Sequence, residues 1–320
     1  MKPICYVGFD TSNYTTSCAV CNADGEVVAN FKAPLPVKAG ECGLRQSDAV
    51  FAHVRNLPVL AAQLREVLRD YRAVAVGCSA TPRTAEDSYM PCFLSGIAAA
   101  EIFAAANDLP IYRFSHQDGH VMAAVYSSGA EDSLLRAPFA AFHVSGGTTE
   151  VLSVKPCENG FSISLVGKTA DLNAGQAIDR VGVMMGLQFP CGKEMEQLAN
   201  GFSGKLPKPR ICVRDGDCNL SGLQNLAERL WNETQDPAAV SAYVFSFVGA
   251  TLEAMTAALD EKMPGLPIVY AGGVMSNRFL QARLAKRANT YFAAPAFSAD
   301  NAAGIALLCR RRFLTEQRKQ

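Results

Sequence analysis

The chain has 320 residues, 49% of them hydrophobic, and its 30 Lys and Arg residues balance its 30 Asp and Glu residues. This length and composition predict a globular protein with two domains, and the zero net charge excludes a global attraction to nucleic acid. No stretch reaches the about 18 uninterrupted apolar residues of a membrane span, and the eleven cysteines form no regular framework, so we expect a cytoplasmic protein with reduced thiols.

The first predicted elements are three strands within residues 4–31, separated by a polar turn and an Asp-Gly turn. Residues 47–69 predict a helix with a break at Pro58, and the short apolar strand RAVAVGCSA follows it. An Ala-rich helix is expected at 93–107, with the strand LPIYRFS after it.

A second set of three strands is predicted in residues 141–167, again with a small polar turn between the first two. No close residue repeat links the two sets, so the repetition is one of architecture. A later strand, GLPIVYAGG, leads into a helix that we expect Ser276 to cap. Strands that alternate with helices indicate α/β layers, and two such units would form a cleft lined by Gly-rich turns.

Two of the four histidines lie in the stretch FSHQDGH, residues 114–120. Ser115 and Asp118 have the spacing of a capping box, which predicts a helix that begins here. His116 and His120 are four residues apart and would share one face of that helix, where two imidazoles can bind one metal ion. Surface histidines near a helix start are the alternative.

A third metal ligand must come from elsewhere, and the late loop FSADNAAG offers Asp300. Two histidines and one carboxylate suit iron or zinc, although Asp300 could equally cap the helix after it. The HExxH metalloproteases share the histidine spacing, but Gln117 stands where they need a basic Glu. Because Gln117 cannot take up a proton, a protease is the weakest interpretation.

Two further stretches suggest a nucleotide site. In VSGGTTE, small residues between two strands would let backbone N–H groups approach a phosphate, although Gly-Gly turns also join ordinary hairpins. In ADLNAGQAIDRVGVMMGLQFP, Gly175, Gly182 and Gly186 fall around Asp179. This helical face has no side chains other than that of Asp179. It could admit a ligand whose ribose hydroxyls Asp179 would bind, or it could allow close helix-to-sheet packing. Asn277, beside the late helix start, could contact a base edge or a sugar.

Two local groups of cations are candidates for RNA contact. The first consists of Lys205, Lys208, Arg210 and Arg214, and the second is the tail from Arg310 to Lys319. A solvated basic face explains either group equally well.

The order of these motifs resembles one family, the tRNA threonylcarbamoyladenosine transferases, formerly named O-sialoglycoprotein endopeptidases. The matching stretches span nearly the whole chain in the family's order: GFDTS, HQDGH, VSGGTTE, NAGQAIDRVGVMMGLQFPCG, NLSGL, AGGVMSNR and DNAAG. The resemblance implies an α/β fold of two related actin- and sugar-kinase-like domains around a nucleotide cleft. We expect one domain of residues 1–115 plus 301–320 and a second of residues 116–300.

The resemblance also implies the site residues. His116, His120 and Asp300 would hold one divalent transition metal, iron or zinc, and Asp10 and Asp179 would be catalytic carboxylates. The ligand would be an adenine nucleotide, either threonylcarbamoyl-AMP or ATP/ADP. Its implied contacts are His143, Val144, Ser145, Gly146, Gly147, Asp179, Gly192 and Asn277.

The implied reaction moves a threonylcarbamoyl group from threonylcarbamoyl-adenylate to the adenosine beside the tRNA anticodon, and AMP is released. The implied partners are tRNA and proteins of the same pathway, among them a same-fold heterodimer partner, with no membrane. Several family positions differ here: Tyr14 and Thr15 replace an acidic pair, Thr148 replaces a His, and Cys191 replaces a Gly. Two alternatives therefore stay open: a non-catalytic partner of the same fold, and an ATPase or phosphotransferase of that fold.

Overall fold

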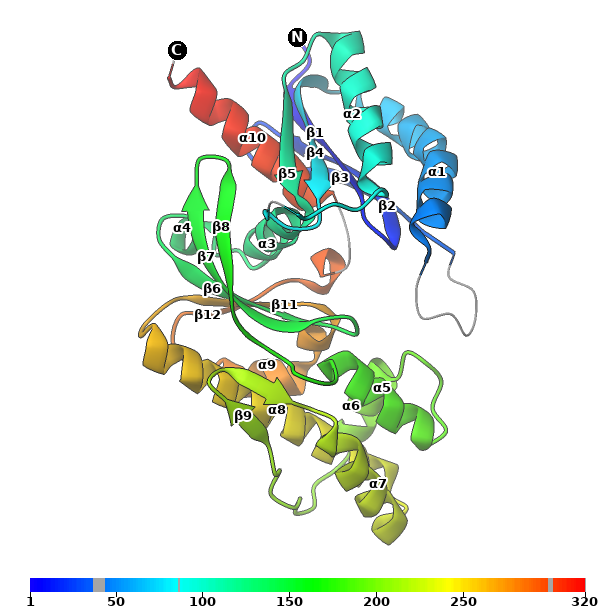
Figure 1. Ribbon diagram of the computed structural model, residues 1–320, viewed down its shortest axis with the longest axis vertical. Helices are drawn as coiled ribbons and strands as arrows, with labels where there is room; N and C mark the ends of the chain where they lie inside the picture. The colour runs from blue at the N-terminus through cyan, green and yellow to red at the C-terminus, as the bar shows by residue number, and fades with distance from the viewer. Residues whose placement is uncertain (37–43, 86, 299–301, 320) are drawn as a thin grey trace. The chain divides into compact units, whose positions relative to one another are not determined.

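The computed structural model describes residues 1–36, 44–85, 87–298 and 302–319. The chain forms two compact units, each with its own sheet (Figure 1). The first unit contains Met1–Tyr126, Pro156–Ser162 and Ala299–Gln320, and the second contains Ser127–Lys155 and Ile163–Ser298. The expected domain boundary between residues 115 and 116 stays a prediction, and the helix that begins at His116 lies within the first unit almost to its end.

The first unit is built on a five-stranded sheet in the order β3-β2-β1-β4-β5. β2 is antiparallel to both β1 and β3, whereas β4 is parallel to both β1 and β5. The strands are β1 (Ile4–Thr11), β2 (Thr15–Asn22), β3 (Val27–Pro34), β4 (Arg72–Thr81) and β5 (Ile111–Ser115). The three strands predicted at the start of the chain are confirmed.

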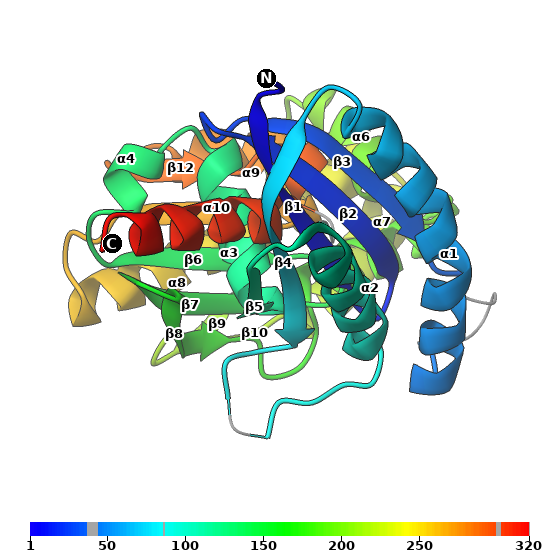
Figure 2. The same ribbon diagram turned by 90° about the horizontal axis from the view of Figure 1, so that it is seen from above.

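Helices cover both faces of this sheet. α1 (Gln46–Val67) and α2 (Phe93–Asn107) lie on the side opposite to α10 (Ala303–Gln317), as Figure 2 shows. Glycine lets α10 approach the sheet, because a Cβ added at Gly8 would lie 2.5 Å from the backbone nitrogen of Ala306. α3 (His116–Ser127) follows β5 directly.

The predicted break at Pro58 is wrong, because α1 runs through this residue. A proline inside a helix leaves the carbonyl four residues earlier, here that of Val54, without its helical partner. Pro58 and Val54 are both exposed, so water can satisfy that carbonyl and the helix continues.

The second unit repeats the topology of the first, with the strand order β12-β11-β6-β7-β8. β6 is antiparallel to β7 and parallel to β11, as β1 is to β2 and β4. The strands are β6 (Phe139–Val144), β7 (Thr149–Cys157), β8 (Gly160–Lys168), β11 (Ile268–Ala271) and β12 (Thr290–Phe292). The architectural repeat predicted from the two strand sets is therefore confirmed.

The remaining elements of the second unit surround its sheet. They are the helices α4 (Glu131–Leu134), α5 (Ala174–Met184), α6 (Gly192–Asn200), α7 (Gly222–Thr234), α8 (Pro237–Lys262) and α9 (Arg278–Leu284), the strands β9 (Cys212–Arg214) and β10 (Asp217–Asn219), and the 3-10 helices η1 (Gly273–Ser276) and η2 (Pro295–Phe297). By length and composition α8 could cross a membrane, but 72% of its most apolar window is buried in the protein. α8 is thus the central core helix of this unit.

One exposed carboxylate, that of Asp171, joins the segment before α5 to the start of α7. It accepts hydrogen bonds from the Ser221 hydroxyl at 2.6 Å and from the Leu220 N–H at 2.8 Å. Burial by itself would raise the pKa of Asp171, but these hydrogen bonds and that from the Leu172 N–H outweigh burial and hold the pKa well below its usual range. The ionised carboxylate therefore stabilises this junction.

Replacing Asp171 by Ala should lower the melting temperature at neutral pH by roughly 2–4 °C, because a capping contact of this kind contributes about 1 kcal/mol. The folded-state pKa is lowered, so the contribution is present above the unfolded-state pKa of about 3.9 and is lost as pH falls through the folded-state value. Melting curves by circular dichroism between pH about 7 and about 2 measure both effects. Asp132→Ala, on the exposed face of α4, is the control, and a neutral-pH melting temperature equal to that of the wild type would contradict the assignment.

Candidate functional site

In the first unit, the predicted capping box sets the start of α3. The Ser115 hydroxyl accepts from the Asp118 N–H at 3.0 Å, and the Asp118 carboxylate accepts from the Ser115 N–H at 3.1 Å. This reciprocal pair places His116 and His120 on the first turns of the helix, with their Nε2 atoms 2.9 Å apart. The predicted shared face of the two imidazoles is confirmed.

Asp10, near the end of β1, holds the His116 ring from its other side. Its Oδ1 accepts from Nδ1 of His116 at 2.8 Å, and its side chain is only 1% exposed. This contact favours the neutral tautomer with the proton on Nδ1, so that Nε2 of His116 is unprotonated where it faces His120. Oδ2 of Asp10 is buried and has no hydrogen-bond partner among the described residues.

The two imidazole nitrogens could hold a metal. Their separation of 2.9 Å suits one hydrogen bond, and it is also close to the about 3 Å between two ligands that bind one ion at about 2.1 Å and at right angles. Asp300, the expected third ligand, lies outside the described residues. Within the part of the chain that the structure describes, no three His, Cys, Asp or Glu side chains converge as a metal site.

Asp118 does more than the sequence predicted. Its buried carboxylate also accepts from the Ser115 hydroxyl at 2.7 Å, the Phe161 N–H at 3.2 Å and the Thr84 hydroxyl at 3.3 Å. Burial raises the pKa of Asp118, and these hydrogen bonds partly offset that effect. Asp118 thereby ties three segments of the first unit together next to the histidine pair, and only the capping contact is visible in the sequence.

A further residue of this region, His53 on α1, escaped the sequence analysis. It is fully buried, and its Nδ1 lies 2.8 Å from the hydroxyl of Thr16 on β2. Burial lowers the pKa of His53, while the Ser12 carbonyl and the charge of Asp10 oppose that effect. Nε2 of His53 is buried and has no hydrogen-bond partner among the described residues. His53 lies inside a long amphipathic helix, so apart from the scarcity of histidine no sequence pattern indicates that it is buried near Asp10.

In the second unit, residues 145–148 form the turn between β6 and β7. The Ser145 hydroxyl accepts from the N–H groups of Gly147, at 3.3 Å, and Thr148, at 3.1 Å. A Cβ added at Gly146 or Gly147 would meet nothing within 4 Å, and both residues are exposed. The turn is therefore held from inside by Ser145 and open on its outer side, where a ligand can approach the backbone.

The start of α5 packs directly on this turn. The Gly175 N–H donates to the Ser145 carbonyl at 3.1 Å, and a Cβ at Gly175 would lie 2.6 Å from the Gly146 nitrogen. Likewise, a Cβ at Gly182 would collide with the side chain of Cys191. For these two glycines, close packing is the interpretation that holds.

Asp179 faces the beginning of α6. Its carboxylate accepts from the Cys191 N–H at 2.8 Å, next to Gly192, the first residue of that helix. Burial raises the pKa of Asp179, and the Cys191 N–H opposes the effect. Asp179 is half-buried, so it is both a contact to the α6 start and reachable from solvent.

Asn277, not Ser276, caps α9. Its Oδ1 accepts from the Leu280 N–H at 3.0 Å, whereas Ser276 is the last residue of η1, which corrects the predicted cap. Asn277 is only 6% exposed, and its Nδ2 has no hydrogen-bond partner among the described residues. A buried amide donor without a partner is costly, so it favours a ligand that accepts from it.

The predicted site residues thus fall into two groups. The first unit brings Asp10, His116 and His120 together. In the second unit, the turn that follows His143 and Val144 contacts α5 at Gly175. Asp179 binds the N–H of Cys191, the residue before Gly192. A Cβ at Gly272 would collide with the Val144 carbonyl, so η1 and Asn277 also follow closely on β6.

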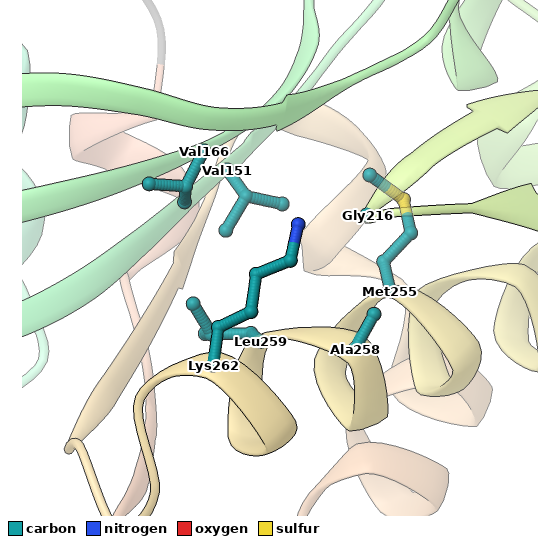
Figure 3. A pocket seen from close by; sticks show the side chains of 7 residues that line it. All are labelled: Val151, Val166, Gly216, Met255, Ala258, Leu259 and Lys262. Atoms are coloured by element: carbon teal, nitrogen blue, oxygen red, sulfur yellow. The ribbon is translucent and has the colours of Figure 1, made fainter.

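Three buried thiols, and one small cavity of the second unit, do not offer a competing site among the described residues. Burial raises the pKa of the thiols of Cys5, Cys21 and Cys78 to about 12, so these thiols stay protonated. A cavity of about 10 Å³ lies between Val151 and Val166 on one side and Met255, Leu259 and Lys262 of α8 on the other (Figure 3). It has room for about one water molecule and none for a nucleotide.

Comparison with known proteins points to one family. The family model described as tRNA N6-adenosine threonylcarbamoyltransferase (TsaD) matches residues 89–307. Proteins of that name from Streptococcus suis (strain 05ZYH33) and Streptococcus pneumoniae (strain Taiwan19F-14) are 31% and 30% identical over 293 residues, which are 89% of this chain and 84% of each relative.

Solved structures show the same fold at low identity. Full-length HypF in its phosphate- and nucleotide-bound form aligns with a TM-score of 0.58, and the alignment covers 97% of this chain and 47% of HypF. A ROK family glucokinase from Streptomyces griseus aligns with a TM-score of 0.53, and the alignment covers 96% of this chain and 99% of the glucokinase. Each of the two is 12% identical to this chain. The two repeated units are therefore those of the actin and sugar-kinase fold, as predicted. By its family match and its relatives, the chain belongs to the tRNA N6-adenosine threonylcarbamoyltransferase family.

Proposed function

We propose that this protein transfers a threonylcarbamoyl group from threonylcarbamoyl-AMP to the amino group of the adenosine beside the tRNA anticodon, in the cytoplasm. The amino nitrogen attacks the carbamoyl carbon, the bond from that carbon to the phosphate oxygen breaks, AMP leaves with the electron pair, and the amine loses a proton. Family membership supports this reaction. The observation that carries it for this chain is the contact series from Asp10 through His116 to His120.

We propose that His116, His120 and Asp300 hold one iron or zinc ion. Two imidazoles and a carboxylate suit either metal, and the Nε2 atoms of the two histidines already lie side by side. When bound, the metal would act as a Lewis acid toward the adenylate. Asp10, expected as a catalytic carboxylate, has the contacts of a positioning residue, since it fixes the tautomer and orientation of His116.

We propose that the second unit binds the adenine nucleotide. The open outer side of the turn at Gly146 and Gly147 suits the phosphate. Asp179 would accept from the ribose hydroxyls, and the unpartnered Nδ2 of Asn277 would donate to the base or sugar. His143 and Gly192 flank these groups on β6 and α6.

We propose further that a second chain of the same fold docks on α1 and α2. Large apolar side chains are exposed along both helices: Phe51 (65%), Val54 (57%), Val59 (58%), Leu94 (50%) and Ile102 (71%). Exposed apolar side chains on two neighbouring helices fit a helical partner surface. This feature suits an enzyme with a partner, and it also suits a non-catalytic subunit, the second candidate function, which the replacement of the acidic pair by Tyr14 and Thr15 favours.

The metal proposal predicts that Asp10→Asn lowers metal affinity about 10- to 100-fold, because the amide no longer selects the Nδ1-protonated tautomer of His116. Competition with a chromophoric chelator measures the affinity. Nitrogen-15 NMR of the metal-free protein reads the tautomer at pH about 8.5, where an ordinary imidazole is neutral. His116→Ala with His120→Ala should abolish binding, whereas His143→Ala in the other unit should keep it.

A matched control for the carboxyl-to-amide change is Asp24→Asn, in the exposed turn between β2 and β3. Two results contradict the proposal: equal metal content in the wild type and the double histidine variant, or an Nε2-protonated His116 in the wild type.

The nucleotide proposal predicts that Asp179→Asn weakens binding of AMP or a non-hydrolysable adenylate by about 1–3 kcal/mol, the range for hydrogen bonds to charged groups. Asn preserves the side-chain shape and can still accept from the Cys191 N–H, so a change in affinity reports the ligand contact. Titration calorimetry measures it, with Glu194→Gln, exposed on α6, as the control. Unchanged affinity in Asp179→Asn would remove this residue from the site.

The transfer reaction itself predicts modified adenosine when the wild type is incubated with threonylcarbamoyl-AMP, tRNA and its partner proteins. Restoring the acidic pair as Tyr14→Asp with Thr15→Glu should change the rate by less than about tenfold, or roughly 1.4 kcal/mol of barrier, if other groups do the work of that pair. Mass spectrometry of the tRNA nucleosides gives the yield.

The transferase proposal is wrong if the wild type forms no modified adenosine while a control enzyme does. If the wild type then also co-purifies with a protein of the same fold, the result supports the non-catalytic subunit. Release of ADP from ATP that depends on a small-molecule substrate and not on tRNA would instead support a phosphotransferase.

A further inference from the structure

The structure separates the two groups of cations that the sequence offered for RNA contact. In the C-terminal group, Arg312 pairs with Glu158 at 3.0 Å and with Glu316 at 2.9 Å, and Lys319 also pairs with Glu158. Arg310 donates from Nε to the Ala23 carbonyl at 2.8 Å. These cations hold α10 to its own unit, so their charge is largely used within the protein.

The other group lies in the segment that connects α6 to β9. We define the basic segment as Lys205, Lys208 and Arg210, within residues 201–213, a stretch that contains no Asp or Glu. All three side chains are exposed, and none forms an ion pair or side-chain hydrogen bond with a described residue. Arg214 is not part of this segment, because it lies opposite Asp217 in the β9–β10 ladder.

The backbone beneath the basic segment is held in place. Leu206, Ile211 and Val213 pack against the hydrophobic core of the second unit, next to the cations that point outward. Pro207 and Pro209 fix their own φ angles and favour extended conformations for the residues before them, including Lys208. The three cations are therefore presented on a stiff, anchored strip, which lowers the entropy lost when they bind a partner.

We infer that the basic segment contacts phosphate groups of the tRNA backbone, an inference that rests on the proposed function. Spaced cations without carboxylates suit a polyanion, and in a chain with zero net charge the attraction must be local. The segment leaves the end of α6, whose first residue Gly192 adjoins Asp179, so one unit would carry both the nucleotide contacts and the RNA contact. Phosphate contacts of this kind position the RNA and read no sequence.

The test compares two triple variants of the full chain with equal charge change. The first is Lys205→Gln, Lys208→Gln and Arg210→Gln. The control is Lys155→Gln, Arg229→Gln and Lys286→Gln, at exposed cations elsewhere in the same unit. Binding of an unmodified tRNA transcript is measured by fluorescence anisotropy over about 50–300 mM salt, and calorimetry with AMP checks that each variant keeps its nucleotide site.

The first variant should bind tRNA at least about tenfold more weakly at roughly 0.1 M salt, with a log–log salt slope smaller by about 2–3, while the control stays within about threefold of the wild type. Equal loss in both variants, or none in the first, overturns the inference, and so does a wild type that binds no tRNA or binds polyglutamate as tightly. If the wild type binds tRNA through this segment but forms no modified adenosine, the inference holds and the proposed function is wrong. If the first variant modifies tRNA fully and with an unchanged KM, the inference is wrong and the proposed function holds.

Discussion

The hydrogen bond between Asp10 and His116 is the contact on which the chemistry of the first unit depends. It joins the end of a central strand to the first turn of α3, and it sets which nitrogen of the ring faces His120. It can form because the reciprocal bonds of Ser115 and Asp118 start the helix at His116. Asp118 also binds Thr84 and Phe161, so the orientation of one imidazole relies on segments from across the unit.

In the second unit, close packing at glycines, and not a charged contact, positions the predicted site residues. Gly175 and Gly182 carry no side chain because the β6–β7 turn and Cys191 occupy that space. The departure at Cys191 from the family's glycine is thereby accommodated: its side chain fills room beside Gly182, and its N–H still serves Asp179. The Cys191 side chain fits because Gly182 has no Cβ that would collide with it.

Local patterns made much of this structure predictable. The two strand meanders, the capping box at Ser115 and the shared face of His116 and His120 all follow from short-range spacing. Two predictions failed for reasons that the sequence pattern does not show. Solvent exposure lets α1 continue through Pro58, and the 3-10 helix η1 directly before α9 moves the cap to Asn277. The role of Asp118 beyond its cap and the burial of His53 arise from tertiary contacts between segments more than thirty residues apart, which no local pattern encodes.

The burial of His53 bears on how docking at α1 and metal binding could be coupled. α1 presents Phe51 and Val54 to solvent on either side of His53, whose ring contacts Thr16 and lies within electrostatic reach of Asp10. A protein that docked on the outer face of α1 would therefore contact the helix that carries His53, whose ring lies within electrostatic reach of the carboxylate that orients His116. By thermodynamic reciprocity, if docking on α1 alters metal affinity, then metal binding must alter the affinity for the docked protein by the same factor.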